Sequence, residues 1–224
     1  MKTIFNQRKN GLNSFCFLIW LLVYPLSSYC NPEGSFSKLK SSNGIDLYYR
    51  WMKMADGHKV RQLKAVLDIQ GGTEEVVNLL RDEAHAMEWI QSARQYRILT
   101  EAPGSAWMNY IRFSVPWPLA DQDCILEYTM EEISQGETRI NFQCMPEYLE
   151  QVEGVSRMKD IYGTMVVKAL SDTQSRLECY FLSKKASVIP RWVTEPIITS
   201  NILKVMEGLR NQILKQSSQI SYLP

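Results

Sequence analysis

The chain has 224 residues, with 25 Lys and Arg against 24 Asp and Glu, so its formal net charge is +1. This length is enough for one domain with a substantial core, and the even charge balance gives no reason to expect a nucleic-acid partner. Hydrophobic residues make up 45% of the chain and charged residues 22%, which is typical of a globular protein.

The N-terminal segment, residues 1–30, has the pattern of a signal peptide. Lys2, Arg8 and Lys9 give a basic start, and the uncharged run "FCFLIWLLVY" follows before a proline and small residues. A membrane-spanning helix needs about 20 apolar residues, and this run is much shorter. We therefore expect cleavage after Cys30 and export, to the periplasm of a Gram-negative bacterium or otherwise to the cell exterior. Two alternatives stay open, a lipoprotein that keeps a lipidated Cys30 and an uncleaved anchor.

The mature chain begins with a polar, turn-rich stretch, residues 31–43, which we expect to be a loose leader. Alternation of apolar and polar residues predicts a strand over 44–51 and a second over 58–69, joined by a turn at 55–57. A helix is predicted over 73–82, with Thr73 as its N-cap, and a second short helical piece over 83–93.

Antiparallel strands are then predicted in succession. They cover residues 94–101, 106–117, 123–133, 137–145, 162–171 and 176–184, while 150–157 reads as a loop or a single helical turn. In the hairpin around Gly136, the two apolar sets share a face only if the numbers of paired residues sum to an even value. A three-residue loop with Gly136 in the left-handed conformation achieves this. Cys124 and Cys144 are then diagonal neighbours, too far apart for a disulfide, and we expect them and Cys179 to be free, buried thiols.

The chain ends in a predicted amphipathic helix over 191–216, whose apolar stripe includes Ile198, Ile202 and Met206. One long helix can cover one face of a curved antiparallel sheet. The sequence therefore predicts an α+β fold with a single domain over 44–217, followed by a tail over 218–224.

The stretch "PWPLADQD", residues 116–123, separates two predicted strands, because Pro116 and Pro118 cannot donate hydrogen bonds to a sheet. From the residues alone it is a stiff connection in which Trp117 plugs the edge of the sheet. It also resembles the "PWPLxDRD" element of START domains, the steroidogenic-acute-regulatory-protein-related lipid-transfer family, although Gln122 stands where that family often has arginine.

Two further stretches resemble the same family in the same order. "VVNLLRDEAHAMEWI" is similar to the family's helix that leads to a tryptophan, with Asp82 and Trp89 in place, and "SKKASVIPRWV" is similar to its "GxIPxW" start of the last helix. The resemblance spans roughly residues 44 to 213. It implies a helix-grip fold, in which a curved antiparallel sheet wraps around the C-terminal helix and a tunnel between them holds a sterol, a phospholipid or another apolar molecule.

The resemblance implies binding of a lipid for carriage or sensing, with a transient contact to membranes, no cofactor and no nucleic acid. The alternative is a helix-grip enzyme, a cyclase or hydrolase, acting on a hydrophobic substrate. His58 and His85 lie in no spacing that is typical of a metal site, and no convergent acid–base pair is found, which favours binding. The expected ligand-binding residues, polar and apolar, lie on predicted strands and on the last helix: Asn109, Arg112, Tyr128, Asn141, Tyr162, Lys168, Ile198, Ile202 and Met206.

Overall fold

The computed structural model describes residues 34–101, 105–117, 120–183 and 191–220. The predicted signal peptide, residues 1–30, lies outside these ranges. Eight of the strands are β1 (Ser37–Ser42), β2 (Ile45–Lys53), β3 (Lys59–Gln70), β4 (Ala93–Glu101), β5 (Ala106–Phe113), β6 (Gln122–Ser134), β7 (Glu137–Cys144) and β8 (Ser156–Arg157). The remaining elements are β9 (Ile161–Ala169), β10 (Gln174–Ser183) and the helices α1 (Thr73–Arg81), α2 (Ala86–Trp89) and α3 (Arg191–Ile220).

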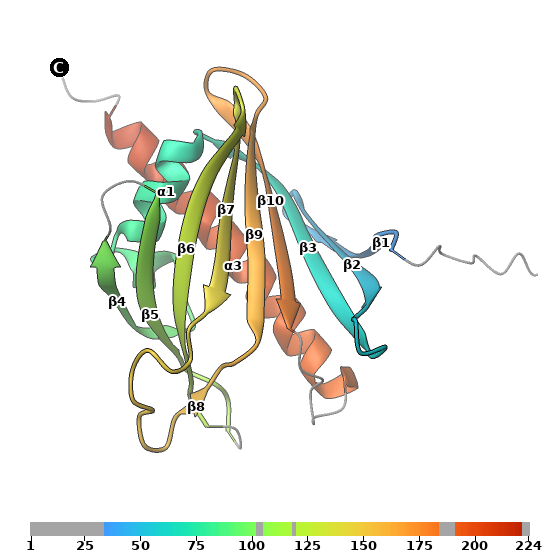
Figure 1. The fold of residues 1–224 in the computed structure, drawn as a ribbon. Coiled ribbons are helices and arrows are strands. Elements are labelled where there is room, and N and C mark those ends of the chain that lie inside the picture. The colour runs from blue at the N-terminus through green and yellow to red at the C-terminus, as the bar shows by residue number, and fades with distance from the viewer. Residues whose placement is uncertain (1–33, 102–104, 118–119, 184–190, 221–224) are drawn as a thin grey trace, which may run out of the picture. The chain divides into compact units, whose positions relative to one another are not determined.

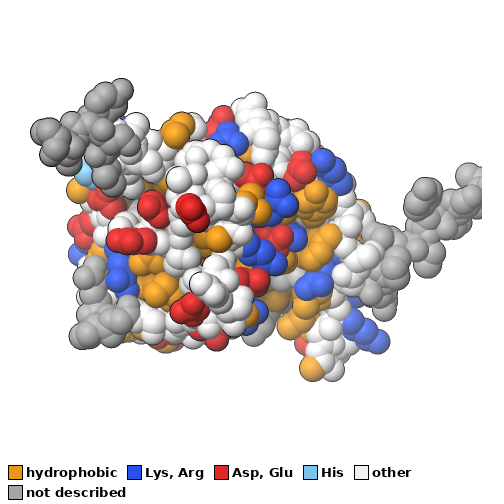
Figure 2. All heavy atoms as spheres, turned by 90° about the horizontal axis from the view of Figure 1, so that it is seen from above, with side chains coloured by type: hydrophobic (Ala, Val, Ile, Leu, Met, Phe, Trp, Pro, Cys, Tyr) orange, Lys and Arg blue, Asp and Glu red, His pale blue; other side chains and the backbone are white. Residues whose placement is uncertain are grey.

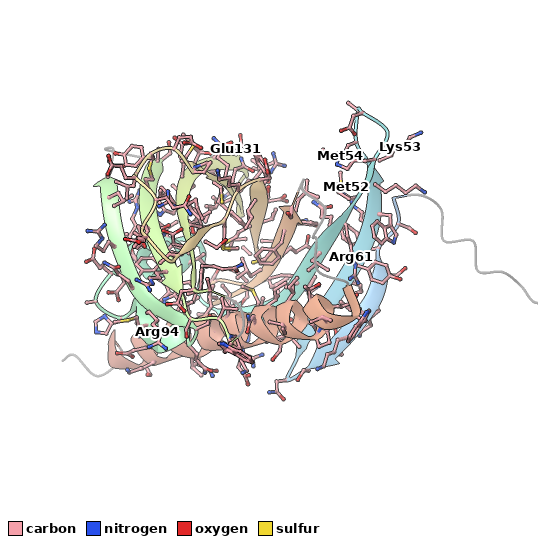
Figure 3. All side chains as sticks on the ribbon, turned by 90° about the horizontal axis from the view of Figure 1, so that it is seen from below. Met52, Lys53, Met54, Arg61, Arg94 and Glu131 are labelled. Carbon is pink, nitrogen blue, oxygen red and sulfur yellow. The ribbon has the colours of Figure 1, made fainter. Side chains whose placement is uncertain are left out.

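Within the described residues, ten strands form one curved sheet, and α3 lies across its open side (Figures 1 and 3). The strand order is β1-β2-β3-β10-β9-β7-β6-β5-β4, with every neighbouring pair antiparallel except the short β8, which pairs in parallel with β6. The helix α3 packs against β3 and β2 and against α1 and α2. This arrangement confirms the α+β, helix-grip architecture that the sequence predicts.

Alternation along the strands separates an apolar concave face from a convex face that is mainly polar, although Met108, Tyr110 and Ile125 form a smaller apolar cluster on it. On β5, for example, Trp107 and Ile111 belong to the main core, whereas Arg112 points to the other side. The convex face carries ion pairs between neighbouring strands, such as Lys64 with Glu178 at 3.1 Å. Viewed from above, acidic and basic side chains are interspersed (Figure 2), in line with the even charge balance of the chain.

The β6–β7 hairpin has the predicted even register, with Tyr128 opposite Phe142 and Leu126 opposite Cys144. The predicted three-residue loop is wrong, because Ser134 pairs with Glu137 and leaves a loop of two residues. Gly136 has a φ of 80°, in the left-handed region, and a bulge between Glu132 and Ser134 keeps both apolar sets on the concave face. Cys124 is therefore a diagonal neighbour of Cys144. Among the described residues all three cysteines are free and buried, as predicted.

The stretch expected to be a loose leader contains β1, because its backbone pairs with β2 and Leu39 packs against the core. Phe36 fixes the start of this strand, since its ring lies 4.6 Å from the guanidinium carbon of Arg50 and its centroid 6.0 Å from that of Tyr180. Because this edge strand consists mainly of lysines and serines, it lacks the alternation of apolar and polar residues that predicts the other strands. These lysines and serines are also typical of an edge that avoids pairing with other chains.

Other expectations need correction. The helix α1 begins at Thr73 but its N-cap is Gly72, whose N–H donates to the Glu75 carboxylate at 2.8 Å. Residues 156–157 form the strand β8 rather than a loop, and α3 extends to Ile220, into the predicted tail. The side chain of Trp117 is 91% exposed, so it does not plug the edge of the sheet.

The helix α3 approaches α2 closely at Gly208. A β-carbon at this position would lie 2.3 Å from the backbone oxygen of Trp89, so the crossing requires glycine. Pro196 lies in the first turns of α3, before this crossing. In the described part of the chain, no helix is long and apolar enough to cross a membrane.

Candidate functional site

The space between the concave face and α3 is lined mainly by apolar side chains. Inward-facing residues of the central strands, from Trp107 on β5 to Leu177 on β10, join residues of α1, α2 and α3 in one cluster. Most of these side chains are almost fully buried. A buried apolar environment of this kind favours an apolar molecule and penalises any polar group that has no partner.

One part of this cluster meets solvent. Its partly buried members include the last residue of β5, a residue after β8, the first residue of β9, a residue near the end of β10 and one on α3: Phe113, Met158, Ile161, Phe181 and Ile202. We call these five residues the apolar rim. The strand ends that carry it lie at the end of the sheet where α3 begins (Figure 1). The apolar rim is therefore the part of this cluster at which apolar side chains of the concave face meet solvent.

A polar cluster lies deeper on the concave face, centred on Asn109, whose exposure is 0%. The Asn109 amide nitrogen donates to the Tyr96 hydroxyl at 2.5 Å, and that hydroxyl donates to the Leu80 carbonyl at 2.5 Å. Among the described residues, the Asn109 side-chain oxygen has no hydrogen-bond partner. The cluster thus holds a buried acceptor that is not satisfied.

Aromatic rings surround this cluster. The Trp107 ring stacks on Tyr128 with centroids 4.9 Å apart and planes at 2°, and the Arg81 guanidinium carbon lies 4.5 Å from the Trp107 centroid. The Trp107 indole nitrogen is a buried donor that also has no partner among the described residues. Burial raises the pKa of the Tyr96 and Tyr128 hydroxyls far above their usual range, so both stay protonated at neutral pH.

A second polar group lies on the concave face of β3, close to the first turns of α3. The Arg61 guanidinium donates to both Glu195 carboxylate oxygens, at 2.8 and 3.4 Å, and stacks on the Tyr49 ring at 4.3 Å. Figure 3 shows Arg61 on the strand that borders α3. This pair fixes the first turns of α3 to the sheet with a charge interaction, where the helix exposes Trp192 and Ile198.

Of the nine predicted binding residues, four face inward or lie at the rim. Asn109, Tyr128 and Met206 are buried in the interior, with exposures of 0%, 3% and 2%, and Ile202 belongs to the apolar rim. Ile198 was also expected to face the ligand, but it is 45% exposed. The apolar stripe of α3 is therefore not covered along its whole length.

The other four predicted residues lie on the convex face, so their expected place in the tunnel is corrected. Arg112 binds Asp121 at 3.0 Å and Lys168 lies 3.9 Å from Glu137. Asn141 accepts a hydrogen bond from Thr164 at 3.0 Å. Tyr162 precedes Gly163, whose absent side chain leaves room for the Phe142 ring on the inner side. Each alternates with residues of the core, and strict alternation therefore turns them outward.

Two shallow depressions lie elsewhere on the surface. One, of about 310 Å³, is lined on the convex face by Asn141, Tyr162 and neighbouring residues of β6, β7 and β9. The other, of about 320 Å³, lies beside the end of β2 and includes Gly34 and Trp51. Both are partly open to solvent, and the residues that line them include neither a member of the apolar rim nor Asn109. The concave face therefore remains the better candidate for an apolar ligand.

The three thiols add no reactive group to this interior. Burial raises the pKa of Cys124 and Cys179 far above the usual range and that of Cys144 to about 11. A thiol is a nucleophile only as the thiolate, so none of the three is activated at neutral pH.

Sequence reasoning missed Tyr96, Trp107 and Arg61. Trp107 shares the alternation of Asn109 and could have been found by applying the same rule to the whole strand. Arg61 could not have been found from the sequence, because its partner Glu195 is 134 residues away along the chain.

No family model matches the chain. A curated relative, an uncharacterised protein from Pseudomonas aeruginosa, is 20% identical over 177 residues, which cover 79% of this chain and 86% of that protein. Among solved structures, a STAR-related lipid transfer protein from Xanthomonas axonopodis is similar with a TM-score of 0.69 and 20% identity, covering 80% of this chain and 98% of that one.

Human STARD10 is similar with a TM-score of 0.66 and 15% identity, over 87% of this chain and 80% of that one. The ZhuI aromatase/cyclase from Streptomyces sp. R1128 is similar with a TM-score of 0.52 and 12% identity, over 70% of this chain and 96% of that one. These likenesses agree with the strand order and the position of α3. The chain has the helix-grip fold of START lipid-transfer domains.

Proposed function

We propose that this protein binds an apolar small molecule, such as a lipid, between its sheet and α3, and carries or senses it without changing it. The observation that carries this proposal is the apolar rim, where an apolar interior meets solvent, together with buried polar atoms in that interior, among them the Asn109 oxygen, that have no partner among the described residues. A buried acceptor without a partner destabilises a fully packed core by about 1–3 kcal/mol, which argues against a fully packed core here.

An enzyme of the same fold is the second proposal, and the similarity to an aromatase/cyclase favours it. Catalysis of this kind needs a group that gives or takes a proton near neutral pH. The interior hydroxyls and thiols have pKa values raised by burial, which supports binding over catalysis. Native mass spectrometry of the purified protein, followed by extraction of the ligand, separates the two. An unchanged ligand after prolonged incubation supports a carrier, and a converted one supports the enzyme.

A pair of tryptophan substitutions on α3 tests the position of the site. Ile202→Trp fills space at the apolar rim, and Leu214→Trp makes the same change at a position on the same helix that is 52% exposed. We expect Ile202→Trp to reduce the uptake of a fluorescent lipid about tenfold or more and Leu214→Trp to leave it unchanged. The urea midpoint of each variant shows whether the change acts through stability. Equal uptake by both variants would place the site elsewhere.

We further propose that the protein is exported by residues 1–30, and that its transient contact with membranes occurs outside the cytoplasm. Sequencing the N-terminus of protein from its native host tests this. We expect a first residue near Asn31, and a chain that begins at Met1 would remove the argument for a carrier of the cell envelope.

A further inference from the structure

The Asn109 cluster carries more information about the ligand than the apolar lining does. The orientation of the Asn109 amide is set by its neighbours, because the Tyr96 hydroxyl already donates to the Leu80 carbonyl and can only accept from Asn109. The nitrogen of Asn109 therefore faces Tyr96, and the oxygen is the atom left without a partner among the described residues.

The position of Asn109 on β5 connects this oxygen with the apolar rim. Asn109 and Phe113 lie four residues apart on the same face of the strand, which corresponds to about 13 Å. Ile111 lies between them on that face and belongs to the same apolar cluster. Along β5, a molecule that enters at the rim with its polar end first thus meets only apolar side chains before it reaches Asn109.

The chemistry of the cluster limits what this polar end can be. A carbonyl oxygen accepts hydrogen bonds, so the ligand must present a donor. An ionised carboxylate or phosphate has no proton to donate and would bring a negative charge into an apolar interior at a high desolvation cost. A hydroxyl donates to Asn109 without a charge, and its lone pairs stay able to accept from a donor. Trp107, whose indole N–H is another buried group without a partner among the described residues, lies two residues from Asn109 on the same face of β5.

We propose that the ligand is an uncharged apolar alcohol whose hydroxyl donates to the Asn109 side-chain oxygen, rather than a lipid with an ionised head group. This inference rests on the proposed function, because it assumes that a ligand occupies the concave face. It makes Asn109 the residue that selects for the head group and assigns Trp107 a supporting contact.

The test compares ligands that differ only in the donor, on two scaffolds. The first set consists of hexadecyl chains that carry a pyrene at one end and a hydroxyl, a carboxylate or a methyl group at the other. The other is dehydroergosterol and its acetate ester, in which the hydroxyl proton is absent. Binding to the wild-type protein is measured by fluorescence, and then binding to Asn109→Leu. Asn141→Leu is the matched control, since it makes the same change on the convex face.

We expect the wild-type protein to bind the alcohol at least tenfold more tightly than its counterparts without a donor on one or both scaffolds, as the loss of one buried hydrogen bond predicts. Asn109→Leu should reduce this preference to less than threefold, while Asn141→Leu should keep it. If Asn109→Leu fails to fold, the affinities of the wild-type protein for the alcohols and for their counterparts still test the choice of head group.

Three outcomes would overturn the inference. Equal affinity of wild-type protein for the alcohols and their counterparts would refute the choice of head group and leave the proposed function intact. A preference for the alcohol that survives Asn109→Leu in a folded protein would refute the role of Asn109. If none of the probes binds, the proposed function fails, and this inference fails with it.

Discussion

The ion pair between Asp123 and Arg157 offers a sharp test of how the end of the sheet near the apolar rim is held together. The two side chains are 0% and 2% exposed, and the Arg157 guanidinium donates to both Asp123 oxygens at 2.7 and 3.0 Å. It also donates to the carbonyls of Pro146, Leu149 and Glu150 at 2.7, 3.0 and 3.1 Å. One guanidinium thus satisfies a buried carboxylate and fixes the connection that follows β7.

Replacing Arg157 with Met should destabilise the protein strongly, because it leaves the Asp123 carboxylate buried without a partner. Breaking a buried pair in this way costs about 3–5 kcal/mol. With a urea m-value of about 2 kcal/mol/M, the midpoint should fall by about 1.5–2.5 M. Arg139→Met is the matched control, since the Arg139–Glu131 pair is 40% and 51% exposed and should contribute less than about 1 kcal/mol.

A double variant separates the pair from the rest of the network. In Asp123→Leu/Arg157→Met no buried charge remains, so its cost should be clearly smaller than the sum of the two single costs. Chemical denaturation followed by circular dichroism measures all four proteins. A cost below about 1 kcal/mol for Arg157→Met, or strict additivity in the double variant, would refute the idea that the two charges depend on each other.

Three other predictions concern packing, thiols and pH. Gly208→Ala should cost about 1–3 kcal/mol by urea denaturation, because its β-carbon would lie 2.3 Å from the Trp89 backbone oxygen, and a neutral result would mean that α3 shifts freely. A thiol reagent should label the denatured mature protein at three cysteines and the native protein slowly, whereas a single reactive group after denaturation would reveal a disulfide. Stability should fall as the pH rises from about 9 toward 11. The pKa of Cys144 is raised from 9.0 to about 11 by burial, so above pH 9 the unfolded chain binds fewer protons than the folded one. The decline should be smaller in Cys144→Ala, and an identical pH profile would contradict the assignment.

The sequence by itself determined most of the strands, with β1 and β8 missed, the inner faces of their apolar residues, and the hairpin register. These features depend on local alternation, and one shifted residue in the β6–β7 hairpin would have turned Tyr128 and Phe142 toward solvent. It also indicated the fold, because three separate stretches resemble START domains in the same order. The same local rule places Tyr128 on the inner face, because it alternates with the apolar residues of its strand. Asn109 was expected inside together with Arg112, Asn141 and Lys168, and these three lie on the convex face.

Only the tertiary structure decided which of these residues form a site. Tyr96 meets Asn109 because β4 and β5 pair with a bulge between Ile98 and Thr100, and no local pattern specifies that bulge. Arg61 and Glu195 meet only when α3 crosses the sheet.

The same is true of α3, where periodicity treats Ile198, Ile202 and Met206 alike. In the structure they are exposed, partly buried and buried, in that order along the helix. A helical stripe records which side of the helix is apolar, but the extent of its burial depends on how far the curved sheet reaches along the helix.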